Sequence, residues 1–337
     1  MAAPRPTIAD VARLAQVSIA TVSRVLNRSV PVDAETAARV RAAVAELNYV
    51  PHAAARTLAS RRTDTIGLLL SEIGGEFFQP MLRGIELTAS QAGFDLLIHS
   101  TRAPRPQDAP HRPLGEHNTD GLLVFTDSLD GRELARLNRV GFPLVLLHQT
   151  PPDGLDLPAV TIENRSGTQR IVEHLIEAHG CRRIVFLRGP AGNQDSQERE
   201  QGYRRALKTH GLAVIPELIA EGGFDGPRAQ AAVAGLLAAG IEFDALFTGD
   251  DDSAVGVYEA LRASGRRVGT DVAVAGFDDS TFARLLTPPL TTVRAPLEQV
   301  GATATSLLVR IIRGESVEPT TVLPTEPIIR RSCGCQN

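Results

Sequence analysis

The residues best suited to chemistry lie together near the N-terminus. Small hydroxyl and amide side chains recur there at helical spacing beside one arginine, Arg24. Hydroxyls and amides donate hydrogen bonds to phosphates and so set the register of a protein on a duplex. An arginine fork fits guanine O6 and N7 and discriminates between bases by roughly 1–3 kcal/mol. Apolar neighbours suit contact with a base edge. The pattern predicts a helix that reads DNA through Ser18, Ile19, Ala20, Thr21, Ser23, Arg24 and Asn27.

Three short helices are needed to position such a reading helix. Thr7 opens a Thr-x-x-Asp capping pattern, and we also expect Thr7 to contact DNA. Apolar residues follow on one helical face, at Ile8, Val11, Ala12 and Ala15. Ser18 is placed to cap a second helix, which runs through Asn27, and Asp33 to cap a third. Three helices with a tight turn between the first two form a helix-turn-helix unit, which we place at residues 1–48.

The distribution of charge supports a polyanionic partner for this head. The 337-residue chain has a net charge of −4. Residues 1–62 hold nine arginines and no lysine against four acidic residues, a net charge of +5, which leaves −9 on the remainder. A basic head on an acidic body is the footprint of a protein that binds nucleic acid. A solvated surface would also fit the charge, so the helix pattern carries the prediction.

Length and composition indicate an ordinary globular protein with two or three cores. Hydrophobic residues make up 43% of the chain and charged residues 22%. Apolar runs fall short of the roughly 18 residues of a membrane helix. The start, Met1-Ala2-Ala3-Pro4-Arg5, lacks the apolar segment of a secretory signal, so we expect a cytoplasmic protein without a membrane partner.

After Thr65 the chain alternates short apolar runs with helical stretches, which predicts an α/β body with parallel sheets. The expected strands are Ile66–Leu70, Leu96–Ile98, Gly121–Phe125, Leu144–Leu147, Val160–Ile162, Ile184–Leu187, Leu246–Thr248 and Val272–Ala275. The expected helices are Gln79–Ala92, Ser166–Ala178, Glu198–His210, Arg228–Ala239 and Ser253–Ala263. About 270 residues are too many for one compact sheet layer, so we expect two lobes with a ligand in the cleft at the strand ends.

The head resembles the signature head of the lac/galactose repressor family. The matching runs are Thr7–Ala12, Val17–Asn27 and Leu47–Pro51, and the segment Ala53–Leu58 matches the family's hinge helix. The resemblance implies that two hinge helices pair across a dimer and wedge Leu58 into the central minor groove, with Arg56 beside it. An apolar wedge of this kind parts a base step and kinks DNA, most easily at a pyrimidine–purine step such as CG. A core leucine is the alternative interpretation of Leu58.

The body resembles the family's sensor core, which is like a periplasmic binding protein. The matching stretches are Gly121–Val124, Glu163–Gly167, Gly276–Asp279, Pro288–Val293 and Glu326–Ser332. The expected divisions are a hinge and linker at 49–63, an N-terminal lobe at 64–162 and 293–324, and a C-terminal lobe at 163–292 and 325–337.

The resemblance also implies a set of effector contacts. An aromatic plate, an arginine and carboxylates suit a polyhydroxylated ring, because the plate covers its CH face and charged groups bind its hydroxyls. For each residue taken alone, core packing or a surface turn is an equal alternative, and Phe78 especially could be core. The implied positions are Phe77, Phe78, Arg199, Phe224, Asp250 and Asp278.

Two stretches depart from the family pattern. The segment Thr101–Asn118 is rich in proline, which predicts a truncated helix in the N-terminal lobe. Where the family often has an Asp-Arg pair after a strand, this chain has His148-Gln149. His148 either contacts the effector or only caps the strand. The departure leaves an oligosaccharide or glycoside as plausible as a simple monosaccharide.

The three cysteines fit a reducing compartment. Cys181 stands alone and is expected to be a small buried hydrophobe. Cys333 and Cys335 form a Cys-Gly-Cys tail. Zinc would need two further ligands, and none is close in sequence, so we expect neither a metal site nor a cofactor.

The sequence argues against two other classes of protein, enzymes and transport-type sugar-binding proteins. The chain has no GxSxG elbow, P-loop or GxGxxG motif, so we expect no enzyme. Asp250-Asp251-Asp252 would suit a metal only if the three carboxylates converged; consecutive residues diverge, and Asp252 is expected to cap a helix before Ser253. A transport-type sugar-binding protein would share the two lobes but would have a signal peptide in place of the basic head.

These observations predict a repressor controlled by a small molecule. A twofold homodimer would meet a pseudopalindromic operator, and the resemblance implies that bound effector reorients the lobes and changes the hinge spacing. We expect a sugar to release the DNA. The C-terminus lacks a leucine heptad, which favours a dimer over a tetramer.

Overall fold

The computed structural model describes residues 6–27, 30–49, 62–101 and 114–336. The chain divides into two compact units, a head at residues 1–64 and a core at residues 65–337. The predicted hinge contacts Arg56 and Leu58 lie outside the described residues, as does most of the proline-rich segment.

The head consists of α1 (Ile8–Ala15), α2 (Ile19–Asn27) and α3 (Ala34–Glu46). Local hydrogen bonds start each helix as predicted. The Asp10 carboxylate accepts from the Thr7 backbone N–H at 2.9 Å, and Ser18 Oγ accepts from the Thr21 N–H at 3.1 Å. The Asp33 carboxylate accepts from the Thr36 N–H at 3.0 Å. The three helices share a small core, formed by Val11, Ala12, Ala15, Val22, Val40, Ala43 and Tyr49.

The N-terminal lobe of the core is built on a six-stranded parallel sheet of order β11-β5-β4-β3-β1-β2. Its strands are β1 (Thr65–Leu70), β2 (Asp95–Ser100), β3 (Gly121–Phe125), β4 (Leu144–Leu147), β5 (Ala159–Ile162) and β11 (Thr320–Leu323). The helices among the described residues of the lobe are α5 (Phe78–Ala92), α6 (Gly131–Arg139) and α12 (Leu297–Ile312). The C-terminal segment thus returns to complete the first lobe.

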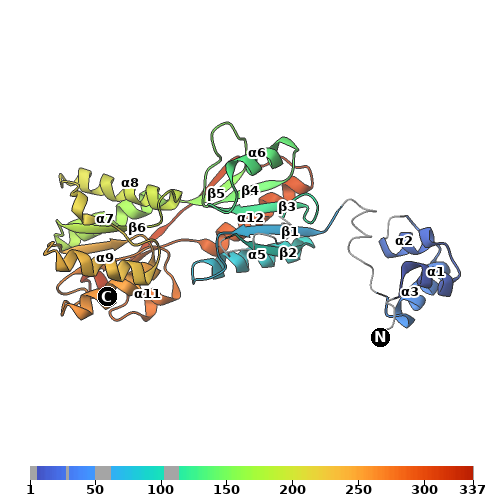
Figure 1. The fold of residues 1–337 in the computed structure, drawn as a ribbon, viewed down its shortest axis with the longest axis horizontal. Coiled ribbons are helices and arrows are strands. Elements are labelled where there is room, and N and C mark those ends of the chain that lie inside the picture. The colour runs from blue at the N-terminus through green and yellow to red at the C-terminus, as the bar shows by residue number, and fades with distance from the viewer. Residues whose placement is uncertain (1–5, 28–29, 50–61, 102–113, 337) are drawn as a thin grey trace, which may run out of the picture. The chain divides into compact units, whose positions relative to one another are not determined.

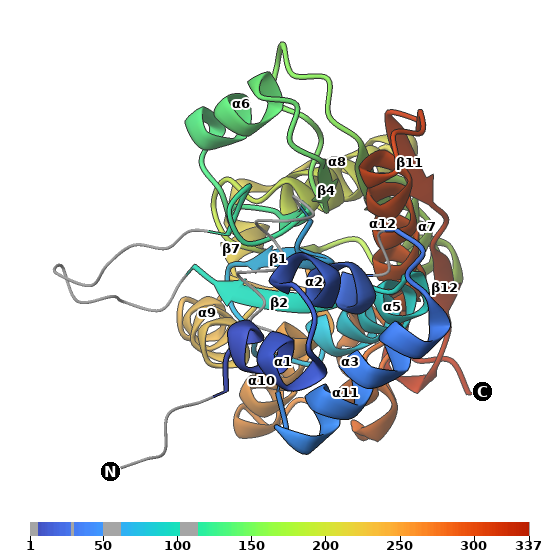
Figure 2. The same cartoon turned by 90° about the vertical axis from the view of Figure 1, so that its right-hand side faces the viewer.

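Helices α5 and α12 lie side by side and cross closely (Figures 1 and 2). Glycines permit the approach, because a Cβ at Gly84 would collide with the backbone carbonyl of Glu298. A Cβ at Gly301 would likewise collide with the carbonyl of Met81. The pair joins the beginning and the end of the core.

The C-terminal lobe is built on a four-stranded parallel sheet of order β7-β6-β8-β9. Its strands are β6 (Ile184–Arg188), β7 (Ile219–Glu221), β8 (Ala245–Thr248) and β9 (Ala273–Ala275). The helices are α7 (Asn164–His179), α8 (Gln194–Thr209), α9 (Gly226–Ala238), α10 (Asp251–Ala263) and α11 (Thr281–Leu285), with a 3-10 turn at Pro216–Leu218. An antiparallel pair, β10 (Thr292–Arg294) and β12 (Glu326–Ile328), precedes a final 3-10 turn at Arg331–Cys333.

The predicted fold class is confirmed: a small helical head precedes a two-lobed α/β core with parallel sheets. One local prediction was wrong. Asp252 does not cap α10; the cap is Asp250, whose carboxylate accepts from the Ser253 N–H at 3.3 Å. Among the described residues, no helix is both long and apolar enough to cross a membrane.

Candidate DNA-binding helix and ligand-binding cleft

Helix α2 presents its predicted DNA contacts on one side and its packing residues on the other. Val22 is completely buried against α1 and α3, which fixes the rotation of the helix. Ile19 is 51% exposed, and Arg24 is exposed as well. Ser18 and Ala20 are also exposed, whereas Thr21 and Ser23 are half-buried, and the Asn27 side chain lies outside the described residues. Thr7 is exposed at the start of α1.

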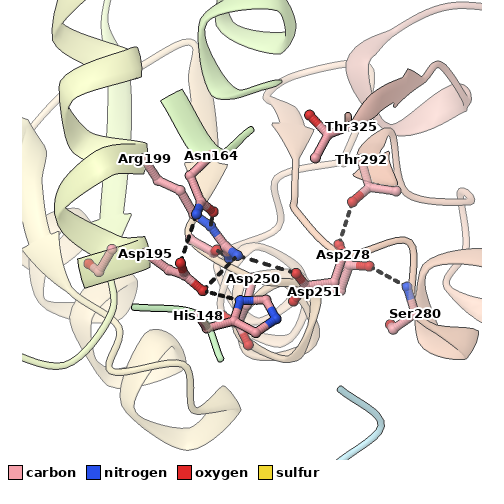
Figure 3. A network of polar contacts seen from close by, with 12 residues as sticks. His148, Asn164, Asp195, Arg199, Asp250, Asp251, Asp278, Ser280, Thr292 and Thr325 are labelled. Carbon is pink, nitrogen blue, oxygen red and sulfur yellow. Dashed lines mark hydrogen bonds and ion pairs between the residues drawn. The ribbon is translucent and has the colours of Figure 1, made fainter. Parts of the chain in front are cut away.

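Arg199 is the centre of a buried polar network in the C-terminal lobe (Figure 3). Its side chain is 2% exposed, and its Nε donates to Asn164 Oδ1 at 2.9 Å. One terminal nitrogen donates to the Gly249 carbonyl, and the other lies 3.5 Å from Asp278 Oδ1. The guanidinium also lies 3.8 Å from the ring centre of Phe277. These contacts hold the arginine side chain in one position as a buried cation.

His148 follows β4 in the N-terminal lobe and reaches across to the C-terminal lobe. Its side chain is fully buried, and Nδ1 lies 2.7 Å from Asp195 Oδ2, at the start of α8. Asp195 also accepts from Asn164 Nδ2 at 2.7 Å. His148 Nε2 is buried and has no hydrogen-bond partner among the described residues. Figure 3 shows this nitrogen on the side of the ring away from Asp195.

Four buried carboxyl groups surround the network with different protonation tendencies. Burial alone would raise the pKa of Asp195, but His148, Arg199 and the Asn164 hydrogen bond hold it below the usual value. Burial raises the pKa of Asp250 to about 6 and that of Asp251 to about 7. It also raises the pKa of Asp278 well above the usual value, although Arg199 opposes the shift. A carboxyl group that is partly protonated near neutrality can both donate to and accept from hydroxyl groups.

Aromatic rings border the network on two sides. The Phe77 ring centre lies 5.3 Å from that of His148 and 6.0 Å from that of Phe125. Phe78 is buried in the hydrophobic core, and its ring centre lies 5.2 Å from that of Phe125. Phe224 lies 5.6 Å from the Arg199 guanidinium, where a Cβ at Gly189 would collide with its ring.

A cavity of about 530 Å³ lies between the lobes. Phe77 lines the cavity from the N-terminal lobe, and Asp278 lines it from the C-terminal lobe. The remaining walls include Asp279, Ser280, Arg284, Arg294 and Pro296. Of the seven predicted effector contacts, only Phe77 and Asp278 line this cavity; His148, Arg199 and Asp250 belong to the neighbouring buried network.

Sequence reasoning missed the residues that orient the predicted ones. Asn164 holds both Arg199 and Asp195, and Asp195 holds His148. Phe125 packs on Phe77 and lies 5.4 Å from His148. All three residues end a predicted strand or begin a helix after one, so the rule that ligands bind beyond strand ends was the available signal.

Comparisons with known proteins agree with this architecture. Residues 7–52 match the model of bacterial regulatory proteins of the lacI family, and residues 172–333 match that of the periplasmic binding protein-like domain. The HTH-type transcriptional regulator CelR of Thermobifida fusca is 37% identical over 97% of this chain and 98% of its own. The ribose operon repressor of Escherichia coli K12 is 32% identical over 96% of this chain and 98% of its own.

Solved structures give the same result. The complex of the regulator CelR with cellobiose superposes with a TM-score of 0.72, at 34% identity over 97% of this chain and 100% of the other. The lac repressor dimer bound to operator and the anti-inducer ONPF superposes with a TM-score of 0.83, at 27% identity over 98% and 99%. A DNA-reading head that matches along with the core is not the pattern of a transport-type binding protein. The chain therefore belongs to the lacI family of bacterial regulatory proteins and is a DNA-binding transcriptional regulator.

Proposed function

We propose that this protein is a cytoplasmic repressor without catalytic activity, which binds a pseudopalindromic operator as a homodimer and releases it when a sugar or glycoside occupies the cleft. Each subunit supplies one head. Exposed α2 residues read base edges, and neighbouring hydroxyls hold phosphates. The proposed contacts are Thr7, Ser18, Ile19, Ala20, Thr21, Ser23, Arg24 and Asn27, with Arg56 and Leu58 following in the hinge.

The buried Nε2 atom of His148, which lacks a partner among the described residues, carries the effector proposal. A buried polar atom left unpaired costs roughly 1–3 kcal/mol, so this atom suits a ligand's hydrogen bond. His148 does not itself line the cavity, but its ring centre lies 5.3 Å from that of Phe77, which does. Asp278 borders the cavity within the same network and can bind hydroxyl groups. The Phe77 ring, next to His148, can cover the CH face of a sugar ring.

We place the effector across both lobes, at Phe77, His148, Arg199, Phe224, Asp250 and Asp278, and leave Phe78 a packing role. The contact of His148 with Asp195 joins the N-terminal to the C-terminal lobe. A ligand that bonds to His148 and Asp278 would therefore favour one arrangement of the lobes, and that preference is what a ligand needs to shift a two-state equilibrium.

Differential scanning fluorimetry against a panel tests the effector class. Cellobiose heads the panel because a relative's structure contains it; other glycosides, monosaccharides, sugar phosphates and nucleobases follow. A ligand at 100 times its dissociation constant adds about 2.7 kcal/mol to stability. We expect a sugar or glycoside to raise the melting temperature. A response to nucleobases or phosphates alone would contradict the proposed class.

Operator binding measured with and without the stabilising sugar tests the direction of control. The measurement is the fluorescence anisotropy of a labelled operator, titrated with protein. Induction predicts weaker operator binding in the presence of sugar. Tighter binding would show that the sugar acts as a corepressor and would overturn the proposed release.

A further inference from the structure

The C-terminal tail and helix α7 bring four soft ligand atoms together, away from the cleft. Cys333 and Cys335 flank Gly334 at the end of the chain, and His174 and His179 lie in the last turns of α7. The ring nitrogens and sulfur atoms all lie within 4.8 Å of one another. We propose that these two thiols and two imidazoles hold one structural Zn²⁺ ion, which fastens the C-terminus to α7.

The separations between ligand atoms match the edges of a zinc tetrahedron. Zinc binds sulfur at about 2.3 Å and nitrogen at about 2.0–2.1 Å. In a tetrahedral site these bond lengths place sulfur and nitrogen roughly 3.6 Å apart. His174 Nε2 lies 3.5 Å from Cys333 Sγ and 3.8 Å from Cys335 Sγ. His179 Nε2 lies 3.4 Å from Cys335 Sγ.

Simple thiol–imidazole hydrogen bonds account less well for this arrangement. An imidazole nitrogen either donates one proton or accepts one, yet His174 Nε2 approaches two sulfurs at similar distances. Cys335 Sγ in turn approaches both imidazoles. Two of the four groups, His174 and Cys335, thus each contact two others, which is the geometry expected around a shared ion.

The chain positions the four groups by local means. Two histidines five residues apart on α7 fit the spacing of zinc ligands. Gly334 has a φ of 107°, which lets both flanking thiols turn toward α7, and a Cβ there would approach His179 Nδ1 at 3.3 Å. The Cys-x-Cys spacing is shorter than the usual two to four intervening residues, and the left-handed glycine supplies the compensating turn.

The tail is anchored just before the cluster, so the ligands are held in place. Ser332 Oγ donates to the Val274 carbonyl at 2.6 Å and accepts from the Thr291 N–H at 2.7 Å. Thr291 Oγ1 lies 3.2 Å from Cys333 Sγ. Thiolate and imidazole ligands select zinc over calcium or magnesium, which take oxygen ligands. The expectation of no metal site rested on closeness in sequence, whereas the fold brings the histidines from more than 150 positions away.

Metal analysis of the full chain tests the site. The protein is purified with a reductant and without a polyhistidine tag, because a tag would bind zinc itself. We expect one equivalent of zinc by mass spectrometry after gel filtration, and restoration of one equivalent when the chelated protein is given Zn²⁺. Replacement by Co²⁺ should give the visible bands of tetrahedral cobalt and a thiolate charge-transfer band.

Variants of two half-buried positions make the result specific. Cys335→Ser and His179→Gln should each weaken zinc binding by more than the roughly 10- to 100-fold that loss of an outer hydrogen-bond partner costs. Zinc should raise the melting temperature of the wild type but not of these variants. Cys181→Ala, which removes the buried cysteine outside the cluster, should keep full binding.

Three results would overturn the proposal. One is failure of the reduced wild type to bind Zn²⁺ in competition with a chromophoric chelator. Another is retention of full affinity by both cluster variants while their operator binding shows that they are folded. A third is a cobalt spectrum of octahedral type without thiolate charge transfer.

Discussion

The Nδ1 atom of His148 lies 2.7 Å from Oδ2 of Asp195, and this bond joins the two lobes. It leaves the opposite ring nitrogen, Nε2, buried and without a partner among the described residues. One side chain therefore both ties the lobes together and offers a bond to a ligand. These two tasks are separable by substitution, because they use different atoms.

His148→Asn is expected to weaken effector binding while keeping the lobes joined. The asparagine amide takes the place of Nδ1 and donates to Asp195, whereas nothing replaces Nε2. Loss of a hydrogen bond to a charged or strongly polar group is worth roughly 1.5–3 kcal/mol, or about 10- to 100-fold in affinity. Calorimetry with the effector measures the change, and His117→Gln, at an exposed position, is the control. Unchanged affinity in His148→Asn would show that Nε2 does not contact the effector.

The buried acids predict that stability falls as pH rises toward neutrality. An unfolded aspartate titrates near 3.8, whereas Asp251 has a pKa of about 7 in the folded protein. Between these values the folded state retains a proton that the unfolded state has released. Each pH unit there lowers the free energy of unfolding by up to about 1.4 kcal/mol, and the effect levels off above pH 7.

Urea denaturation at pH 5 to 8 checks this dependence. Asp251→Asn should reduce the slope because the titrating group is gone. Asp271→Asn is the matched control: Arg267 lowers the pKa of exposed Asp271 to about 2, so that group does not titrate in the window. A slope that survives Asp251→Asn unchanged would assign the proton to other groups, such as Asp250.

Arg24→Ala is expected to relax base preference at one position of each half-site. The exposed guanidinium is proposed to fork onto a guanine, worth roughly 1–3 kcal/mol of discrimination. Anisotropy with a panel of single-base operator variants measures it. Arg41→Ala removes the same charge from exposed α3 and should weaken all operators alike, if it weakens any. Equal losses on every operator in Arg24→Ala would assign that residue to phosphate contact.

Two substitutions of helical glycines should have opposite effects, because only one of them, Gly84, lies where α5 crosses α12. Gly84→Ala places a methyl group against the Glu298 carbonyl and should destabilise the core by about 1–3 kcal/mol. Gly235→Ala, inside α9 with nothing within 4 Å of the added carbon, should stabilise by about 0.5–1 kcal/mol. Chemical denaturation measures both. If Gly84→Ala is as stable as the wild type, α5 and α12 can move apart without a loss of stability, which would contradict the prediction.

Most strands that were predicted from sequence are continuous apolar runs, such as β3 and β4, whose residues are all buried. β2 was also predicted, although its residues are exposed or half-buried. Strands β7, β10 and β11 were missed, and each has only three or four residues. β7 has three residues, and β11 lies at the sheet edge with exposed threonine and valine side chains. Helices α6, α11 and α12 were not among the expected helices either.

The sequence likewise predicted only some residues of the candidate site. The resemblance to the family predicted Arg199. It did not predict Asn164, which contacts Arg199, or Asp195, which contacts His148, because these contacts form only where β4, α7 and α8 come together in the fold. The Cys-Gly-Cys tail is plain in sequence, while the histidines beside it come from a distant helix. Hydrogen bonds between residues close in sequence can be predicted from the sequence. Contacts between distant elements depend on how the elements pack, so the sequence alone does not predict them.

The return of the C-terminal segment to the first lobe has a consequence for synthesis on the ribosome. Among the described residues, the core of the head extends no further along the chain than Tyr49, so this core can form once residue 49 has emerged. The first lobe has strands β1 to β5 by residue 162, but its packing helix α12 begins only at residue 297 and its edge strand at residue 320. During synthesis, the sheet of the first lobe therefore has one uncovered face until α12 emerges, whereas the DNA-binding head can already be folded. A chain truncated before α12 would have a complete DNA-binding head attached to a core that lacks α12 and β11.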